Sequence, residues 1–477
     1  MRRASITLLA AMSVAAQASW TVTNLHPSGP TESIARGSSG SLQAGYVTIN
    51  SQVHASIWNG TAASWVDLNP AGSSGSYATA ASGMVQVGYA LVNAAYRASV
   101  WTGTAASWVD MNPAGSTNSY AFALSGSQQA GYAVVGGIFR ASLWSGSAAS
   151  WIDLNPAGST RSIAYGASGS QQVGYAEVDG VARASLWSGT AGSWVDISPA
   201  GTTGSYLYAT TGSQQTGMAR VGGVFHAGLW SGTAGSWVDL NPAGATDSRA
   251  QAMSGSQQVG FATFGGVSRA GLWSGTSASW VDLSAVLPSG FTHSYAQSIS
   301  SDGIYNYVSG YAFSTATFSY QAILWKQPVP RHDISTDLYL GDTVNSFALA
   351  RTISYIVKQG TTTVQSGFVS PQTSSTPITI TVGSNLSGSA SLILDGSSFL
   401  RRVVNFSAAG GATNLGTVLM ANGDADDSGE VDAADIDAVI ADFGSSSVTS
   451  TDVDVSGEVD AADIDIVIGN FGATDEV

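Results

Sequence analysis

A tryptophan returns every 43 residues through nearly half of this chain of 477 residues. One period reads S-Y-A-x-A-x-S-G, Q-V-G-Y-A, R-A-S-L-W-S-G and S-W-V-D-L-N-P-A-G, four short segments separated by turn residues. Four strand-length segments in a period of about 40–45 residues are typical of a β-propeller blade. No segment has the 3.6-residue apolar rhythm that a helical solenoid needs. The repeat therefore predicts a mainly β chain. The tryptophans form two series seven residues apart: Trp58, Trp101, Trp144, Trp187, Trp230 and Trp273, then Trp65, Trp108, Trp151, Trp194, Trp237 and Trp280.

The repeat also predicts how the ring of blades closes. Seven units begin at Ser33, Ser76, Ser119, Ser162, Ser205, Ser248 and Ser294. The last unit ends at Trp325 without its final segment, whereas residues 20–29 repeat the Pro and Gly positions of residues 63–72. We expect residues 20–29 to supply the missing outer strand, which closes a seven-bladed β-propeller and leaves no free sheet edge. The alternative is an open β-solenoid, in which residues 20–29 have no partner.

Two polar positions recur with the same period. A cation lies four residues before each tryptophan of the first series, and an aspartate lies two residues after each of the second. A cation and a carboxylate on adjacent strands of every blade predict an ion pair within each blade; a functional ring of charges is the alternative. The tryptophans themselves are predicted to pack between neighbouring sheets.

Residues 33–325 resemble the bacterial extracellular repeats called HAF repeats. The core of that family is a G-Y/F strand followed by H/R-A-x-L/V-W, which here reads GYALVNAAYRASVW at 88–101 and GMARVGGVFHAGLW at 217–230. The resemblance supports the fold more than any activity.

The start of the chain has the features of a secretory signal over residues 1–18. Arg2 and Arg3 precede an apolar run at 6–16, and Ala16-Gln17-Ala18 is a small-residue cleavage site. No later stretch is long and apolar enough to predict a transmembrane segment. We therefore expect a secreted protein, and since it has no cysteine, packing, closure or metal must replace disulfides.

The repeat region is predicted to occupy residues 19–327, and a second β-rich module residues 328–420. Pro328-Val329-Pro330 separates the two, and segments such as TPITITVG at 376–383 alternate polar and apolar residues. About seven strands in this length suggest an immunoglobulin-like β-sandwich. The module resembles the small sandwiches that precede dockerin-like tails in secreted bacterial proteins. Its function is expected to be that of a spacer or of a glycan-binding module.

The last module, residues 421–477, has two matching acidic loops. They read D-A-D-D-S-G-E-V-D-A-A-D at 424–435 and D-V-D-V-S-G-E-V-D-A-A-D at 452–463. Calcium loops place oxygens at positions 1, 3, 5, 7, 9 and 12 and a glycine at position 6, where this chain has Gly429 and Gly457. Two calcium ions are predicted. Without metal, repulsion among the clustered carboxylates of the loops should keep the module unfolded. The predicted ligands are Asp424, Asp426, Ser428, Glu430, Asp432 and Asp435, then Asp452, Asp454, Ser456, Glu458, Asp460 and Asp463, with each glutamate acting through its carbonyl.

Each loop leads into a short predicted helix, and the pair forms a small α-helical module of EF-hand loops. Ile436, Val439, Ile440 and Phe443 are expected on one face of the first helix, and residues 464–471 repeat that pattern. A paired loop–helix with Asp at position 12 resembles a type I dockerin. That resemblance implies a cohesin-like partner and attachment to a polysaccharide-degrading assembly. Dockerins commonly contact the partner through a hydroxyl pair before the final loop Asp, where this chain has Ala433-Ala434 and Ala461-Ala462.

The net charge of the chain limits the classes of partner that it can bind. A formal net charge of −15 argues against binding nucleic acid or anionic membranes. Because the blades are nearly identical, no single catalytic cluster stands out, and we expect a non-catalytic binding or scaffold protein. An inner-strand position is predicted to form a rim that stacks on the sugars of a polysaccharide or cell-surface glycan; packing between blades is the alternative. That position holds Tyr77, Tyr120, Tyr206, Arg249 and Tyr295, with Ile34 and Ile163 in the remaining units.

The alternative function is a secreted carbohydrate-active enzyme, a glycoside hydrolase or polysaccharide lyase. Hydrolysis needs two carboxylates about 5–10 Å apart across a cleft. The carboxylates outside the repeat pattern are Glu177, Asp179, Asp247 and Asp302, and their spacing in the sequence indicates no pair.

Overall fold

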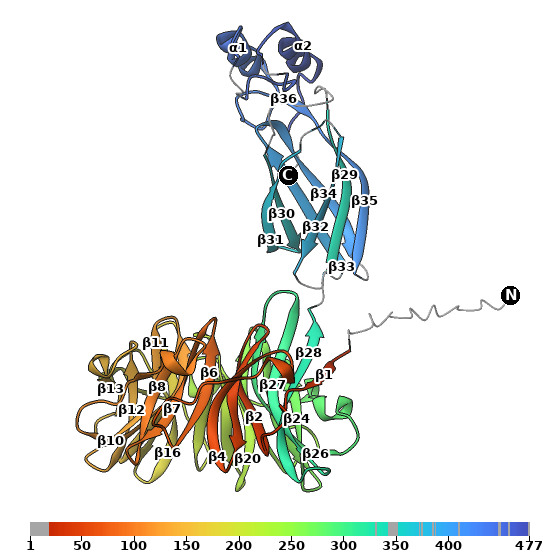
Figure 1. Ribbon diagram of the computed structural model, residues 1–477. Helices are drawn as coiled ribbons and strands as arrows, with labels where there is room; N and C mark the ends of the chain where they lie inside the picture. The colour runs from red at the N-terminus through yellow and green to blue at the C-terminus, as the bar shows by residue number, and fades with distance from the viewer. Residues whose placement is uncertain are drawn as a thin grey trace, which may run out of the picture. The chain divides into compact units, whose positions relative to one another are not determined.

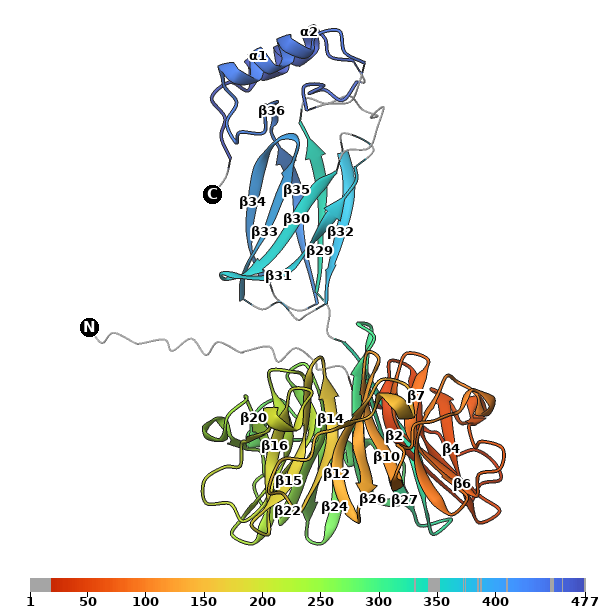
Figure 2. The ribbon, with the colours of Figure 1, turned by 90° about the vertical axis from the view of Figure 1, so that its left-hand side faces the viewer.

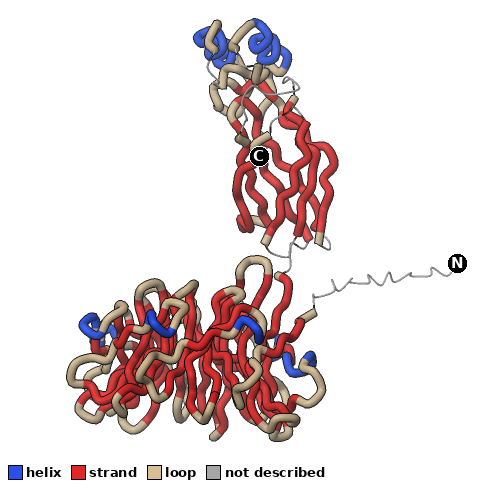
Figure 3. Tube along the Cα trace, in the orientation of Figure 1, coloured by secondary structure: helices blue, strands red, loops and turns tan. Residues whose placement is uncertain are grey.

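The computed structural model describes residues 19–329, 332–341, 352–371, 373, 375–383, 386, 388–408, 411–446, 450–456 and 458–475. The predicted secretory signal at 1–18 lies outside these residues. The chain forms two compact units, Ser19–Pro328 and Val329–Val477, and both are mainly β (Figure 1, Figure 3). No helix in the described part of the chain is long and apolar enough to cross a membrane.

The described residues of the first unit form seven four-stranded antiparallel sheets, the arrangement expected of propeller blades. We number the sheets 1 to 7 in chain order, and a one-turn 3₁₀ helix joins the third strand to the short fourth strand in sheets 1 to 6. Sheets 1 to 3 contain β2 (Glu32–Ser39), β3 (Leu42–Ile49), β4 (Gln52–Asn59) and β5 (Val66–Asp67); β6 (Gly75–Ser82), β7 (Val85–Val92), β8 (Ala95–Trp101) and β9 (Val109–Asp110); and β10 (Ser116–Ser125), β11 (Gln128–Val135), β12 (Ile138–Trp144) and β13 (Ile152–Asp153). Sheets 4 to 6 contain β14 (Arg161–Ser168), β15 (Gln171–Val178), β16 (Val181–Trp187) and β17 (Val195–Asp196); β18 (Ser205–Thr210), β19 (Gln215–Val221), β20 (Val224–Trp230) and β21 (Val238–Asp239); and β22 (Asp247–Ser254), β23 (Gln257–Phe264), β24 (Val267–Trp273) and β25 (Val281–Asp282).

Sheet 7 closes the ring with a strand from the other end of the unit. It consists of β26 (Phe291–Ser301), β27 (Tyr305–Ser314), β28 (Ser319–Pro328) and β1 (Thr21–Asn24). β1 pairs antiparallel with β28, so that Thr21 lies opposite Lys326 and Asn24 opposite Ile323. The first strand of each sheet contacts the first strand of the next, and β26 contacts β2 (Figure 1, Figure 2). The predicted pairing of residues 20–29 is therefore confirmed, and an open solenoid is excluded.

Tryptophans of the first series fill the spaces between sheets, as predicted. All of them, and Trp325 in sheet 7, are at most 1% exposed. Trp187 of sheet 4 belongs to one buried cluster with Leu143 and Leu154 of sheet 3. Small alanine side chains of both sheets complete that cluster, because a large indole needs a shallow surface opposite it.

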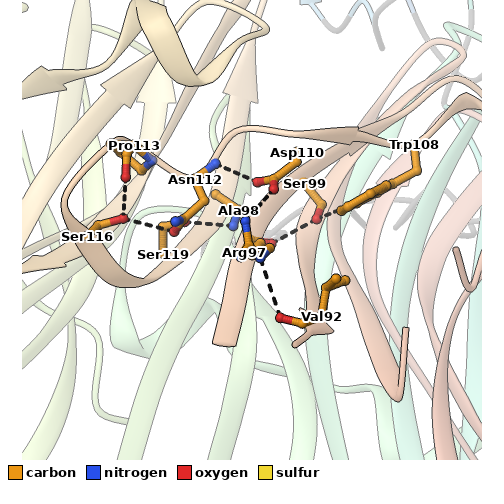
Figure 4. Close-up of polar contacts among 10 residues, drawn as sticks. All are labelled: Val92, Arg97, Ala98, Ser99, Trp108, Asp110, Asn112, Pro113, Ser116 and Ser119. Atoms are coloured by element: carbon orange, nitrogen blue, oxygen red, sulfur yellow. Dashed lines mark hydrogen bonds and ion pairs between the residues drawn. The ribbon is translucent and has the colours of Figure 1, made fainter. Parts of the chain in front are cut away.

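The recurring cation and aspartate form an ion pair within each of sheets 1 to 6, so this prediction is also confirmed. In sheet 2 the Arg97 Nη1 lies 2.7 Å from the Asp110 Oδ2, and the backbone N–H of Asn112 donates to the Asp110 Oδ1 at 2.8 Å. The Ser119 hydroxyl of sheet 3 donates to the Asn112 Oδ1 and accepts from the Ala98 N–H, which ties the two sheets together (Figure 4). The ion pair thus belongs to a structural network. The other five pairs are His54–Asp67, Arg140–Asp153, Arg183–Asp196, His226–Asp239 and Arg269–Asp282.

The second unit joins a two-sheet β module to the acidic tail. One sheet contains β29 (His332–Leu340), β32 (Ser375–Val382) and β35 (Ala412–Met420); the other contains β30 (Ile353–Gln359), β31 (Thr362–Val369), β33 (Gly388–Gly396), β34 (Ser398–Ala408) and β36 (Asn422–Asp424). Two helices follow, α1 (Ala433–Asp442) and α2 (Ala461–Gly469). Val455 of the tail lies in the core of the β module, and Leu400 of β34 lies in the core below the helices. The two predicted modules 328–420 and 421–477 therefore share buried contacts.

Candidate functional site

A β-bulge interrupts the first strand of every sheet in the ring. In sheet 4 the pairing passes from Ala164 directly to Gly166, which leaves Tyr165 without a cross-strand partner. A bulge bends its strand and redirects the unpaired side chain. The same irregularity occurs at the equivalent residue of the other six sheets. We call the seven bulged residues the channel ring: Arg36, Thr79, Phe122, Tyr165, Tyr208, Gln251 and Gln297.

The close approach of the bulged first strand leaves no room for a side chain at the repeated glycine of the second strand. A Cβ added at Gly174 would lie 1.9 Å from the carbonyl oxygen of Ile163, a backbone atom that cannot move aside. The same close approach, at 1.8–2.0 Å, occurs at the matching glycine in each of the other sheets. The glycine in the Q-V-G-Y-A segment is therefore needed to let the strand bulge toward the ring axis.

The channel ring lines a cavity of about 310 Å³. Because one residue from every sheet contributes to it, this cavity lies at the axis of the ring. Its wall has two chemically distinct sides. Phe122, Tyr165 and Tyr208, from sheets 3, 4 and 5, form an aromatic side with ring centroids 5.4 Å apart between neighbours. The other four side chains of the channel ring are polar, and Arg36 is the charged one. Tyr89 of sheet 2 also lines the cavity.

The predicted sugar-stacking rim lies two residues before the channel ring on the same strands. Its tyrosines are packed on other rings of the protein: Tyr77 on Tyr89 at 4.7 Å between centroids, and Tyr120 on Tyr132 at 4.6 Å. The remaining members make similar contacts: Tyr206 lies 4.9 Å from Tyr175, Tyr295 lies 4.9 Å from both Phe261 and Tyr311, and the Arg249 guanidinium lies between Phe225 and Phe261. Ile34 and Ile163 are buried. Some of these contacts lie within one sheet, such as Tyr77 on Tyr89, and others join neighbouring sheets, such as Tyr206 on Tyr175.

A larger pocket of about 660 Å³ opens where sheets 1, 6 and 7 meet. We call it the seam pocket; among its lining residues are Glu32, Arg36, Asp247, Arg249, Tyr295 and Tyr311. Burial raises the pKa of the Glu32 carboxyl and of the Asp247 carboxyl, and the latter is partly offset by Arg249, whose Nε lies 3.8 Å from the Asp247 Oδ2. The pocket therefore brings together two carboxyls that the sequence did not pair.

The other unique carboxylates have structural partners. Glu177 lies in β15 and its Oε2 is 2.8 Å from the Nε of Arg161. Asp179 lies in the following turn with a positive φ of 51°. Asp302 accepts hydrogen bonds from the backbone N–H groups of Ile304 and Tyr305 and holds a hairpin turn. None of these three lines the seam pocket.

The first acidic loop gathers three of its predicted ligands. Carboxylate oxygens of Asp424, Asp426 and Asp435 lie within 4.8 Å of one another. Asp435 is fully buried, and its two oxygens accept backbone N–H groups of Ala425 and Asp432 at 2.7 Å each. Burial raises the pKa of Asp424 to about 6. Two buried carboxylates and the exposed Asp426, held close together, fit a hard divalent cation such as calcium.

The remaining predicted ligands of this loop have other partners. The Ser428 hydroxyl donates to the Glu430 carbonyl at 3.2 Å, which places positions 5 and 7 side by side. The Asp432 Oδ1 accepts the N–H of Ala434 at 2.7 Å and caps α1. Asp432, at position 9, therefore caps the helix directly. It would contact a metal through a water molecule, as is common at that position.

The second loop repeats this arrangement. Asp452, Asp454 and Asp463 form the same cluster, and burial raises the pKa of Asp463. The Ser456 hydroxyl donates to the Glu458 carbonyl, and Asp460 caps α2. Gly457 lies outside the described residues.

The predicted apolar face of each helix is only partly buried. Val439 and Val467 are fully buried, whereas Ile440 and Phe443 are 55% and 56% exposed and Ile468 and Phe471 are both 56% exposed. The four positions of each set still share one side of their helix, since they are spaced i, i+3, i+4 and i+7, but the core buries only part of that side. Ile440 lies one residue, and thus about 100°, beyond the buried Val439, so the core covers one edge of that side and leaves a matching exposed pair on each helix.

No protein-family profile matches the chain, and no curated protein matches it. Several solved structures are partly similar. A mutant type II cohesin–X-dockerin complex from Acetivibrio cellulolyticus is 18% identical over 30% of this chain and 97% of that chain, with a TM-score of 0.25. Puromycin hydrolase is 12% identical over 62% of this chain and 52% of that chain, with a TM-score of 0.40. TolB from Acinetobacter baumannii is 10% identical over 54% of this chain and 64% of that chain, with a TM-score of 0.35.

Proposed function

We propose that this is a secreted, non-catalytic binding and scaffold protein that holds a saccharide in the channel of its ring. The observation that carries the proposal is the channel ring: seven side chains of five types, each at a bulge that faces one axial cavity, with aromatic groups on one side. Pockets that bind small ligands combine an apolar wall with a few placed polar groups. Sugars match this, because a pyranose has an apolar face for aromatic rings and hydroxyls for amides.

In this proposal the ring is a seven-bladed β-propeller of HAF repeats, and the β module is an immunoglobulin-like spacer. The tail is a dockerin-like pair of EF-hand loops that holds two calcium ions. The apolar start of the chain, residues 1–18, supports secretion. Asp424, Asp426 and Asp435 would hold one ion, and Asp452, Asp454 and Asp463 the other.

The tail would dock on a cohesin-like protein through the exposed pairs Ile440–Phe443 and Ile468–Phe471. Contiguous exposed apolar side chains mark interaction surfaces, and these pairs are repeated on both helices. Ala433-Ala434 and Ala461-Ala462 precede the final aspartates, so contact through these apolar pairs would replace the hydroxyl contacts of ordinary dockerins.

Removal of the aromatic wall tests the saccharide proposal. We expect the wild-type protein to be retained on an insoluble polysaccharide, and we expect Tyr165→Ala combined with Tyr208→Ala to weaken retention at least about 10-fold, which corresponds to about 1.4 kcal/mol. A pull-down over a panel of polysaccharides measures this. Tyr305→Ala is the matched control, because that ring lies against the Lys326 ammonium outside the channel. Equal retention of the double variant and the control would contradict a site in the channel.

A second candidate is a carbohydrate-active enzyme, and the seam pocket favours it. Glu32 and Asp247 line the same cavity, and burial raises the pKa of both carboxyls, as a general acid requires. A reducing-sugar assay after incubation with polysaccharides separates the two functions. We expect no release of sugar; release by the wild type that Asp247→Asn abolishes would establish the enzyme.

A further inference from the structure

The channel holds one guanidinium at a point where three cavities meet. Arg36 lines the axial cavity of about 310 Å³, the seam pocket, and a third cavity of about 250 Å³ that contains three residues from each sheet. Its side chain is exposed into this space. A positive charge at this place is notable in a chain with 31 acidic and 16 basic residues.

The guanidinium of Arg36 is not engaged by a carboxylate of the protein. Within the described part of the chain it makes no ion pair, and its partner is the Tyr46 side chain, to which it hydrogen-bonds and whose ring centroid lies 5.7 Å from the guanidinium carbon. Arg97 and Arg161, by comparison, hold carboxylates at 2.7 and 2.8 Å. In the seam pocket it is Arg249 that lies beside Asp247. The guanidinium has five N–H donors, so those that do not bond Tyr46 are available for an external anion.

The groups around Arg36 define what kind of anion fits. Gln251 and Gln297 come from the two sheets that precede sheet 1 around the ring, and they supply amide donors and acceptors for hydroxyls. Across the same cavity lie the aromatic side chains of Phe122, Tyr165 and Tyr208. A ligand that satisfies both sides has an apolar face, several hydroxyls and one carboxylate.

We propose that the channel binds a hexuronic acid unit of an acidic glycan, with its carboxylate on the Arg36 guanidinium. Guanidinium binds carboxylate through two parallel N–H···O bonds, a geometry that a neutral sugar cannot use. The aromatic side stacks on the apolar face of the sugar ring, and the glutamines bind its hydroxyls. This inference rests on the proposed saccharide function and adds the charge class of the ligand.

Calorimetric titration with uronate trimers tests it on the full-length wild-type protein. The probes are trimers of galacturonate, glucuronate and mannuronate, each beside its fully methyl-esterified counterpart, together with neutral cellotriose and benzoate. We expect at least one uronate trimer to bind about 10–100-fold more tightly than its own methyl ester, the loss typical of a hydrogen-bonded charged group. Because this comparison uses one protein, it does not depend on any variant folding.

Two variants then test whether Arg36 is the residue that causes the preference for the acid over the ester. Arg36→Gln should weaken binding of that trimer by the same factor and abolish the difference between acid and ester. Arg161→Gln removes the same charge from an arginine already paired with Glu177, and it should change affinity less than about threefold. Equal affinity for acid and ester, benzoate binding as tight as the trimer, or an unchanged Arg36→Gln would overturn the proposal. Binding of cellotriose without an acid preference would overturn only this inference, whereas binding of no saccharide would overturn the proposed function as well.

Discussion

Replacing Trp187 with alanine is expected to lower the free energy of unfolding of the ring by about 3–5 kcal/mol. The indole is fully buried between sheets 3 and 4. Its neighbours include Ala141 and Ala164, side chains too short to move into the space that the substitution leaves. Urea-induced unfolding, followed by circular dichroism because the substitution removes a fluorophore, measures the change.

The matched control is the tryptophan seven residues later in the same repeat. Trp194 is half-buried, and its Nε1 donates to the Ser185 hydroxyl at 2.8 Å. Because less of its surface leaves water on folding, Trp194→Ala should cost about 1–2 kcal/mol. Equal costs for Trp187→Ala and Trp194→Ala would show that the two series do not play different parts in joining the sheets.

The fold of the ring could be predicted from the sequence because the repeat constrains it many times over. Each tryptophan, aspartate and turn glycine returns in phase, and residues 20–29 stay in phase across the whole ring. Pairing of β1 with β28 then follows from the missing segment after Trp325. The same redundancy explains why the ion pairs were predicted correctly as structural, since six equivalent copies cannot mark one site.

The channel ring could not be predicted, because a bulge is a property of strand pairing. In the repeat S-Y-A-x-A-x-S-G the first variable position is the bulged residue, and the tyrosine two residues before it is the position predicted to stack on sugars. Regular alternation would place these two side chains on the same face of the strand, so the pattern does not distinguish them. The bulge redirects one of the two, and Tyr165 lines the axial cavity. The available signal was variation: Arg36, Phe122 and Gln251 occupy one position in repeats that are otherwise nearly alike.

The carboxyls of the seam pocket show a second limit of the sequence. Glu32 and Asp247 occupy the same position of their repeats, one residue before the repeated serine. They come from sheets 1 and 6, which lie on either side of sheet 7 only because the ring closes. Because the two residues are far apart in the chain, the sequence does not indicate that they line the same pocket, which forms only when the ring closes.

Removal of calcium with EGTA at pH 7.5 is expected to unfold α1 and α2 while the ring stays folded. Each loop buries carboxylates against one another, and calcium that binds only the folded tail stabilises it by about 4 kcal/mol per site when its concentration is 1,000-fold above Kd. Heteronuclear NMR of the full chain follows the signals of both parts, and their recovery on adding two equivalents of calcium checks the stoichiometry.

The metal-free tail should also become less stable as the pH rises. Burial raises the pKa of Asp424 in the folded chain to about 6, from 3.8 when exposed. A carboxyl with a raised folded pKa favours the folded state while it is protonated, so this contribution is present below pH 4 and is lost as the pH rises through about 6. In EGTA the helix signals should therefore be stronger at pH 4.5 than at pH 7.5, whereas in calcium the order should reverse, because metal needs the ionised form.

Two substitutions separate metal binding from a general effect of charge. Asp435→Asn removes a clustered oxygen and should abolish binding of one ion, whereas Asp427→Asn removes the same charge from an exposed side chain outside the cluster. If Asp427→Asn raised the calcium requirement as much as Asp435→Asn, a diffuse acidic surface would explain the binding better than two built sites. If helix signals persisted in EGTA at pH 7.5, the tail would fold on its apolar core alone, of which Val431, Val439 and Val467 are buried members.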